Sequence, residues 1–310
     1  MSIMRSVLLA GAESAWLREH AMRAAFVRRS VARFMPGESM EEALDACRRL
    51  EAERGTPTIL THLGENLASL AEADQVTRHY LELMDRIQSA GLQVQVSVKL
   101  TQLGLDLGQE ACARNLEALV DAAEARGNVV WIDMESSKYV DSTLELFRGA
   151  RERSPRTGVC LQAYLRRTAA DLETLLPLAP SIRLVKGAYR EPPEVAFPRK
   201  ADVDRNYFEL ASRLLEAGAV GGAFVGIGTH DERLVERLRA VIAARRIPRA
   251  SFEFEMLYGI QRPLQARLVR EGAPLRVLVS YGEFWFPWYM WRLAERPANV
   301  LFVAKSVFEG

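Results

Sequence analysis

The sequence predicts an α/β fold in which eight parallel strands alternate with helices and close into a (βα)8 barrel of the TIM type. Short apolar or β-branched runs recur along the chain, and longer amphipathic segments separate them. Eight is the number of strands that closes such a barrel. Neither G-x-G-x-x-G nor G-x-x-x-x-G-K-[ST] occurs, so the usual phosphate-binding loops of an open doubly wound sheet are absent.

The expected strands are short and are separated by helical segments such as 67–91 and 112–127. In those segments apolar residues recur at the spacing of one helix face. The expected strands lie in PTILTHLG, QVQVSVKL, NVVWIDME, GVCLQAYL, IRLVKGAY, AFVGIGTHD, SFEFEML and LRVLVSYG.

Residues 1–50 are expected to form a helical segment packed on the barrel, and residues 51–310 the barrel itself. The apolar run near the N-terminus is thin for a signal peptide, and we interpret it as part of the first helix. A second helix follows Pro36 and Gly37, with Ser39 as its expected N-cap and Glu42 completing a capping box. Gly55 is expected to end that helix.

Composition excludes several classes of function. The chain has 310 residues and a net charge of +1, which is no electrostatic footprint for nucleic acid or anionic lipid. Cys47, Cys112 and Cys160 form no C-x-x-C pair, so neither a disulfide framework nor a zinc site is expected. The histidines show no metal-ligand spacing, and no apolar stretch is long enough to span a bilayer. These features predict a cytoplasmic protein without a metal.

Chemistry in a (βα)8 barrel lies at the carboxyl ends of the strands, so the residues there are the candidates for a site. In chain order they are His62 and Glu65; Lys99; Asp133, Met134 and Glu135; Gln162 and Tyr164; Arg183, Lys186 and Tyr189; Thr229, His230 and Asp231; Glu255 and Leu257; and Tyr281.

Lys99 and Lys186 lie within otherwise apolar strands. Strands of a parallel barrel are covered on both faces, so each lysine either snorkels at a strand edge or points into the mouth. Asp133, from the adjacent strand, is the expected partner of Lys99. The pair is either a structural ion pair or a site in which Asp133 holds Lys99 against a substrate carboxylate.

Arg183 and Lys186 are three residues apart and face opposite sides of a regular strand, unless the chain bends at Gly187. Two cations with no acid beside them suggest an anionic or electron-rich ligand, and two separate salt bridges are an equal alternative. His230 is interpreted as a hydrogen-bonding residue, and Thr229 beside it as a contact for phosphate or ribose.

Residues 281–291 contain seven aromatic side chains in eleven positions. If 283–296 is helical, one broad face carries Trp285, Trp288, Tyr289, Arg292 and Glu295. The alternatives are a core helix, a membrane-surface helix and the roof of a pocket. An inward arginine does not suit a core helix, and a membrane-surface helix would carry several cations on the opposite face. We therefore interpret this segment as a helix over the barrel mouth.

The strings SVKL, LQAYLRR, RLVKGAY, THD, FEFEML and RLAERPANV, in this order, resemble the proline dehydrogenases. The resemblance runs from about residue 50 to the end and is strongest to the short monofunctional bacterial enzymes. It extends to the proline dehydrogenase domain of proline utilization A. It implies a distorted (βα)8 barrel that binds FAD at the carboxyl-end mouth, with the last helix as a roof over the proline site.

The resemblance also implies roles for matching positions. Lys99 and Arg292 would bind the proline carboxylate, Asp133 would hold Lys99, and Arg183 would lie near the flavin N5. The expected FAD contacts are Met134, Gln162, Arg183, Lys186, Gly187, Ala188, Thr229 and His230. The residues expected around the substrate are Tyr189, Leu257, Tyr281, Trp288, Trp291 and Glu295, with Glu65 as a gate.

One position departs from the family pattern. The family usually has two consecutive arginines where this chain has Trp291 and Arg292. The first of them forms a gate-like ion pair with the glutamate that corresponds to Glu65, and Trp291 cannot form it. Losing a charge-assisted contact costs a few kcal/mol, or roughly tens to hundreds-fold in affinity.

The implied reaction is oxidation of L-proline to pyrroline-5-carboxylate by hydride transfer to the flavin, with a membrane quinone as acceptor. Pyrroline-5-carboxylate dehydrogenase would be the downstream partner, and the enzyme would associate peripherally with the inner face of the membrane. Two other hypotheses remain open. One is an FAD-binding homologue whose turnover or specificity is altered by Trp291, and the other is a Schiff-base aldolase or lyase that uses Lys99 or Lys186.

Overall fold

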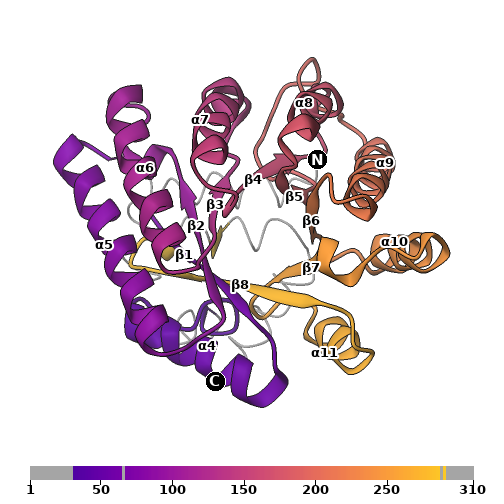
Figure 1. Ribbon diagram of the computed structural model, residues 1–310, viewed down its shortest axis with the longest axis horizontal. Helices are drawn as coiled ribbons and strands as arrows, with labels where there is room; N and C mark the ends of the chain where they lie inside the picture. The colour runs from indigo at the N-terminus through magenta and orange to yellow at the C-terminus, as the bar shows by residue number, and fades with distance from the viewer. Residues whose placement is uncertain (1–30, 65–66, 287–288, 291–310) are drawn as a thin grey trace.

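The computed structural model describes residues 31–64, 67–286 and 289–290. In this part of the chain the strands β1 to β8 form one closed parallel barrel, and helices surround it (Figure 1). The predicted (βα)8 architecture is therefore confirmed, and each expected strand overlaps one observed strand, with β4 and β5 beginning one residue earlier than expected. The strands are β1 (Thr58–His62), β2 (Val94–Lys99), β3 (Val130–Asp133), β4 (Thr157–Gln162), β5 (Ser181–Val185), β6 (Phe224–Gly228), β7 (Phe252–Leu257) and β8 (Leu275–Tyr281).

The helices between the strands bury their apolar faces against the outside of the barrel, where they share the main hydrophobic core with outward-facing strand residues. They are α5 (Leu70–Ser89), α6 (Gln109–Ala125), α7 (Val140–Arg153), α8 (Thr168–Leu175), α9 (Lys200–Ala219), α10 (Glu232–Arg245) and α11 (Arg262–Arg270). Short 3-10 helices are η1 (Thr101–Leu103), η2 (Ser137–Tyr139), η3 (Leu176–Leu178) and η4 (Arg249–Ser251).

Helix α4 (Met40–Arg54) precedes the first strand and contacts β8 and β1 from outside the barrel. In the ring of helices it lies between α5 and α11 (Figure 1). Its predicted caps are confirmed, because Ser39 and Glu42 form a capping box and Gly55 ends the helix at φ 60°. Residues 1–30 of the expected 1–50 helical segment lie outside the described residues. The boundary between this segment and the barrel stays a prediction.

Alternation along the strands separates the outward core from an inward polar set. On β2, Val94, Val96 and Val98 belong to the outer core, so Gln95, Ser97 and Lys99 face the interior of the barrel. The same alternation turns Arg183 of β5 and Glu255 of β7 inward. The barrel therefore has an interior rich in charged and hydrogen-bonding groups.

A second apolar cluster links the two ends of the described chain. Trp285, Phe286 and Tyr289 pack with residues of 31–35, and with Leu63 and Ile260, which follow β1 and β7. The Trp285 indole also donates a hydrogen bond of 2.8 Å to Glu38. Trp285 and Tyr289 are both buried in this cluster, against which Leu257 at the end of β7 also packs. Their expected common face with Arg292 stays a prediction, because Arg292 lies outside the described residues.

Among the described residues, no helix is both long and apolar enough to cross a membrane. The same residues contain no cluster of three or more histidine, cysteine or acidic side chains placed to hold a metal ion.

Candidate active site

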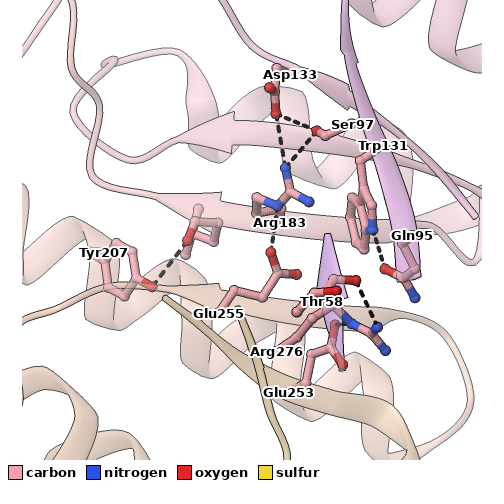
Figure 2. Close-up of polar contacts among 11 residues, drawn as sticks. Thr58, Gln95, Ser97, Trp131, Asp133, Arg183, Tyr207, Glu253, Glu255 and Arg276 are labelled. Atoms are coloured by element: carbon pink, nitrogen blue, oxygen red, sulfur yellow. Dashed lines mark hydrogen bonds and ion pairs between the residues drawn. The ribbon is translucent and has the colours of Figure 1, made fainter. Parts of the chain in front are cut away.

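Arg183 is the centre of the polar network inside the barrel (Figure 2). Its guanidinium donates from Nε to Glu255 at 2.6 Å and from Nη1 to Asp133 at 2.9 Å. Nη1 also donates to Ser97 Oγ at 3.0 Å. Arg183 therefore joins β5 to β2, β3 and β7, and its position is held on three sides.

The face of the same guanidinium lies over Trp131, at 4.7 Å from the ring centroid. A cation over an indole ring gains electrostatic attraction, and more so away from water. Arg183 is 3% exposed, so little solvent screens these contacts. Although burial by itself lowers the pKa of Arg183, Glu255 and Asp133 raise it above its usual value, which keeps the side chain charged.

Two glycines make room for this network. A Cβ at Gly158 would lie 2.5 Å from the Trp131 ring, and a Cβ at Gly226 would lie 2.0 Å from Glu255 Oε1. Neither neighbour is the mobile end of an exposed side chain, because both belong to the buried interior. The lack of a side chain at Gly158 and Gly226 thus leaves the space that Trp131 and Glu255 occupy beside Arg183.

The expected pairing of Lys99 with Asp133 stays a prediction. The two residues are register partners at the ends of β2 and β3, as predicted. The Asp133 carboxylate, however, accepts its recorded bonds from Ser97 at 2.8 Å and from Arg183. Asp133 therefore helps to position Arg183, whose second carboxylate partner is Glu255.

Arg183 and Lys186 each form separate salt bridges, which is one of the two alternatives that the sequence left open. Lys186 donates to Asp204 of α9 at 2.5 Å and to Asp231, the N-cap of α10, at 2.8 Å. Although burial alone would raise it, Lys186 and Lys200 lower the pKa of Asp231 to about 2. Both acids follow Lys186 by many residues in the sequence, so the short stretch around Lys186 could not indicate them.

The ends of β4 and β5 form a backbone cradle. Tyr164 N donates to Lys186 O at 2.8 Å, which continues the pairing of the two strands beyond Gln162. Gly187 follows at φ 114°, and a Cβ there would lie 2.1 Å from the Tyr164 ring. The chain therefore leaves regular strand geometry at Gly187, and glycine is needed there for both its φ and its lack of a side chain.

Several buried polar atoms near these strand ends have no hydrogen-bond partner among the described residues. Gln162 donates from Nε2 to Met134 O at 3.1 Å, while its Oε1 is unpartnered. Arg183 Nη2 and the Tyr164 hydroxyl are unpartnered as well. Buried groups of this kind are usually satisfied, so their common location fits a bound polar molecule.

The strand ends of β6 and β7 are joined through a histidine. His230 Nε2 accepts a hydrogen bond from Leu257 N at 2.9 Å, which agrees with its predicted hydrogen-bonding role. Thr229 is buried, and its hydroxyl accepts from Asp231 N at 3.2 Å. Leu257 is the last residue of β7 and is partly buried. These contacts hold the loop after β6 against β7.

Tyr281 lies on the other side of the barrel wall. It alternates with Val277 and Val279 of the outer core, is fully buried, and shares a 2.6 Å hydrogen bond with His79 of α5. Its expected place around a substrate ring is therefore corrected, because strand alternation turns it toward the helices. The inward residues near the end of β8 are Leu278 and Ser280.

The remaining predicted residues divide into two groups. Ala188 is exposed and Tyr189 is partly buried in the loop after β5, so both border the same end of the barrel. Five predicted residues lie outside the described residues, and their roles stay predictions: Glu65, Trp288, Trp291, Arg292 and Glu295.

Two members of the network were not among the candidate site residues: Ser97 and Trp131. Glu255 was a strand-end candidate without an assigned role. Alternation was the signal that could have found Ser97 and Trp131, because each is an even number of residues from a predicted inward residue on its own strand. Ser97 precedes Lys99 by two, and Trp131 precedes Asp133 by two.

Comparisons with known proteins agree on one family. The sequence profile described as proline dehydrogenase matches residues 43–305. The chain is 38% identical over 283 residues to a proline dehydrogenase of Deinococcus radiodurans, covering 90% of each protein. It is 37% identical over 277 residues to proline dehydrogenase 1 of Bacillus subtilis subsp. natto, covering 89% of this chain and 90% of that one.

Solved structures show the same fold. Proline utilization A from Bdellovibrio bacteriovorus superposes with a TM-score of 0.81 at 24% identity, covering 94% of this chain and 36% of that chain. Proline utilization A from Bradyrhizobium japonicum superposes with a TM-score of 0.75, covering 90% of this chain and 32% of that chain. With the profile matched over most of its length and relatives above 35% identity, the chain belongs to the proline dehydrogenase family.

Proposed function

We propose that the protein oxidises L-proline to pyrroline-5-carboxylate with bound FAD, and that a membrane quinone is the final electron acceptor. The family match over residues 43–305 carries the proposal. The Arg183 network supports it, because it places a fixed, buried cation among the inward residues of the barrel. Bound FAD would supply the hydride acceptor for the proline carbon beside the ring nitrogen.

The residues present fit such a cofactor. Gln162, Tyr164 and Arg183 each keep a buried polar atom without a partner, and Gly187 leaves open the space that a Cβ would fill. Further residues that would hold FAD are Met134, Lys186, Ala188, Thr229 and His230. Lys186 would do so from within its pairs with Asp204 and Asp231, so it would act as a fixed neutralised cation rather than as a mobile one.

On the substrate side, Lys99 would bind the proline carboxylate. It ends β2 at the carboxyl mouth, two residues beyond Ser97 and in register with Asp133. Leu257 and Tyr189 would contact the ring, and Arg292 would take the carboxylate from the roof. Orientation of this kind supplies a large part of the rate, because it replaces random encounter by one geometry.

A Schiff-base mechanism through Lys186 has less support. A lysine that forms a Schiff base reacts as the neutral amine, which apolar or cationic surroundings favour. Lys186 has two carboxylates within 2.8 Å, which is the opposite environment.

An anaerobic titration of the purified protein with proline, followed by flavin absorbance, tests the proposal. We expect a yellow protein that bleaches at millimolar proline. A colourless protein that cannot be reconstituted with FAD would contradict the cofactor assignment. A yellow protein that stays oxidised would favour the second hypothesis, an FAD-binding homologue with altered turnover or specificity. The tryptophan at position 291, where the family usually has arginine, is the observation that motivates it.

The Trp291→Arg variant separates those two outcomes. Restoring a bidentate carboxylate contact is expected to lower KM for proline tens to hundreds-fold. Phe284→Arg is the matched control, because it adds the same charge to the same aromatic segment at an exposed position outside the predicted site. Equal effects of the two variants would contradict a specific role of position 291.

The proposed acceptor implies a location and a partner. A membrane quinone would be reached from the cytoplasm by peripheral association with the inner face of the membrane. The product would pass to pyrroline-5-carboxylate dehydrogenase. Activity with a soluble quinone analogue, compared with and without vesicles, is the direct measurement of this step.

A further inference from the structure

The Glu255 side chain has no place in the function proposed above, yet it is among the most constrained groups in the barrel. It is 4% exposed, and its Oε2 accepts from Arg183 Nε at 2.6 Å. Its Oε1 has no hydrogen-bond partner among the described residues. A buried carboxylate is costly unless it is paired, so its presence needs an explanation beyond filling space.

The pairing determines how Arg183 is oriented. The Nε bond to Glu255 and the Nη1 bonds to Asp133 and Ser97 hold two edges of a planar group, and Trp131 lies against its face. A planar guanidinium held at two edges and one face has a single orientation. Nη2 is the nitrogen that these contacts leave unpartnered.

The pairing also determines the charge. One guanidinium is shared by two carboxylates, Asp133 and Glu255, so the buried group has a formal charge of −1 when all three are ionised. In a medium of low dielectric constant, each of these charges acts strongly on a neighbouring group. Without Glu255, the same group would be neutral and Arg183 would attract added negative charge more strongly.

We propose that Glu255 is a positioning residue that fixes Arg183 and lowers the electron affinity of the flavin bound at this end of the barrel. The inference rests on the proposed function, because it acts on bound FAD through Arg183. The barrel is shaped for it, since the lack of a side chain at Gly226 leaves the space that Glu255 Oε1 occupies.

Glu253 provides a matched control. It is an inward carboxylate of the same strand, two residues earlier, which is roughly 6.6 Å along β7. It accepts from Arg276 Nε at 2.7 Å, and Arg276 also donates to Thr58 O at 3.3 Å (Figure 2). Glu253 therefore has a counter-ion of its own and makes no recorded bond to Arg183.

The test is the midpoint potential of the FAD-loaded protein, wild type against Glu255→Gln and Glu253→Gln. Burial raises the pKa of Glu255 above its usual value, so the measurement is made at pH 8. Glutamine keeps the shape and an acceptor for Arg183 Nε but removes the charge. We expect Glu255→Gln to favour the reduced flavin at least tenfold, or about 30 mV for a two-electron couple. Glu253→Gln is expected to change the equilibrium constant for flavin reduction less than threefold.

A structural role alone would not move the potential. Glu255→Gln could lower thermal stability or kcat and still change the equilibrium constant for flavin reduction less than threefold. That result would overturn the inference. Equal shifts in both variants would overturn it too, because the effect would then be general to buried carboxylates. Should Glu255→Gln fail to fold, Glu255→Met removes the same charge at similar volume and is read in the same way.

Glu255→Ala separates charge from position. We expect it to raise the potential as glutamine does and also to reduce kcat/KM at least tenfold further, since Arg183 Nε loses its acceptor. Equal kcat/KM in the alanine and glutamine variants would overturn the positioning part. Wild-type protein that holds FAD and is reduced by proline, with no shift in Glu255→Gln, contradicts this inference alone. Wild-type protein that holds no FAD contradicts the proposed function and this inference together.

Discussion

The guanidinium of Arg183 lies over the indole of Trp131, with its central carbon 4.7 Å from the ring centroid. The indole is itself fixed, because Nε1 donates to Gln95 Oε1 at 2.7 Å. Gln95, Trp131 and Arg183 come from three different strands, so the orientation of the arginine depends on the closed barrel. Trp131 and Gln95 therefore help to orient Arg183, as Asp133 and Glu255 do.

Trp131→Phe is expected to lower the free energy of unfolding by about 1–2 kcal/mol, because the Gln95 amide oxygen loses its donor inside the barrel. Urea denaturation of the single variant and of Gln95→Leu, Trp131→Phe and the double variant measures this. The double variant should lose less than the sum of the two single losses. Strictly additive losses would show that the bond contributes nothing.

Lys99→Met is expected to lower kcat/KM for proline about thirtyfold. The proposed bond between its ammonium and the substrate carboxylate contributes about 2 kcal/mol, which corresponds to that factor. Steady-state kinetics checks the value. Lys138→Met is the matched control, because Lys138 is 68% exposed on the surface and its recorded partners are Asp106 and the Tyr139 ring. A loss shared by both variants would argue against substrate binding by Lys99.

Gly187→Ala is expected to reduce both stability and FAD affinity. The residue has φ 114°, and the added Cβ would meet the Tyr164 ring at 2.1 Å. Gly55→Ala is the control for backbone strain alone, because Gly55 also has positive φ but nothing within 4 Å. We expect a cost of about 1–2 kcal/mol for Gly55→Ala and clearly more for Gly187→Ala. Thermal melting and FAD titration separate the two effects, and equal costs would contradict the steric part.

Stability is expected to fall as the pH drops from about 6.5 to about 4, through His62. Burial, and secondarily His79, lower the pKa of His62 from 6.5 to about 4. In this window the unfolded chain binds a proton that the folded protein does not, so the unfolded state is favoured. The loss reaches at most about 3 kcal/mol below pH 4.

Urea midpoints at pH 7.5 and pH 5, for wild type and His62→Gln, measure this contribution. The wild type should lose more stability than the variant over that interval, because the variant has no imidazole at this position. The same loss in both proteins would assign the acid sensitivity to other groups.

Local sequence determined the elements of this protein. Ser39 and Glu42 specify the start of α4 and Gly55 its end, and each expected strand overlaps an observed one. Strand alternation even places Tyr281 on the outer face with Val277 and Val279, although its position at a strand end suggested the substrate site. Up to this level the information is contained in neighbouring residues, and the family could be recognised from ordered strings at the strand ends.

The pairing of charges was decided by tertiary structure. Arg183 bonds to Glu255, 72 residues away, while Lys186 bonds to Asp204 and Asp231. Lys99 and Asp133 end adjacent strands, yet the Asp133 carboxylate also accepts a bond from Arg183 of β5, which no neighbouring residue indicates. Closure staggers the strands, so residues that lie at one level inside the barrel come from different positions along each strand. Periodicity tells which side chains face inward, and only the closed barrel decides which of them meet.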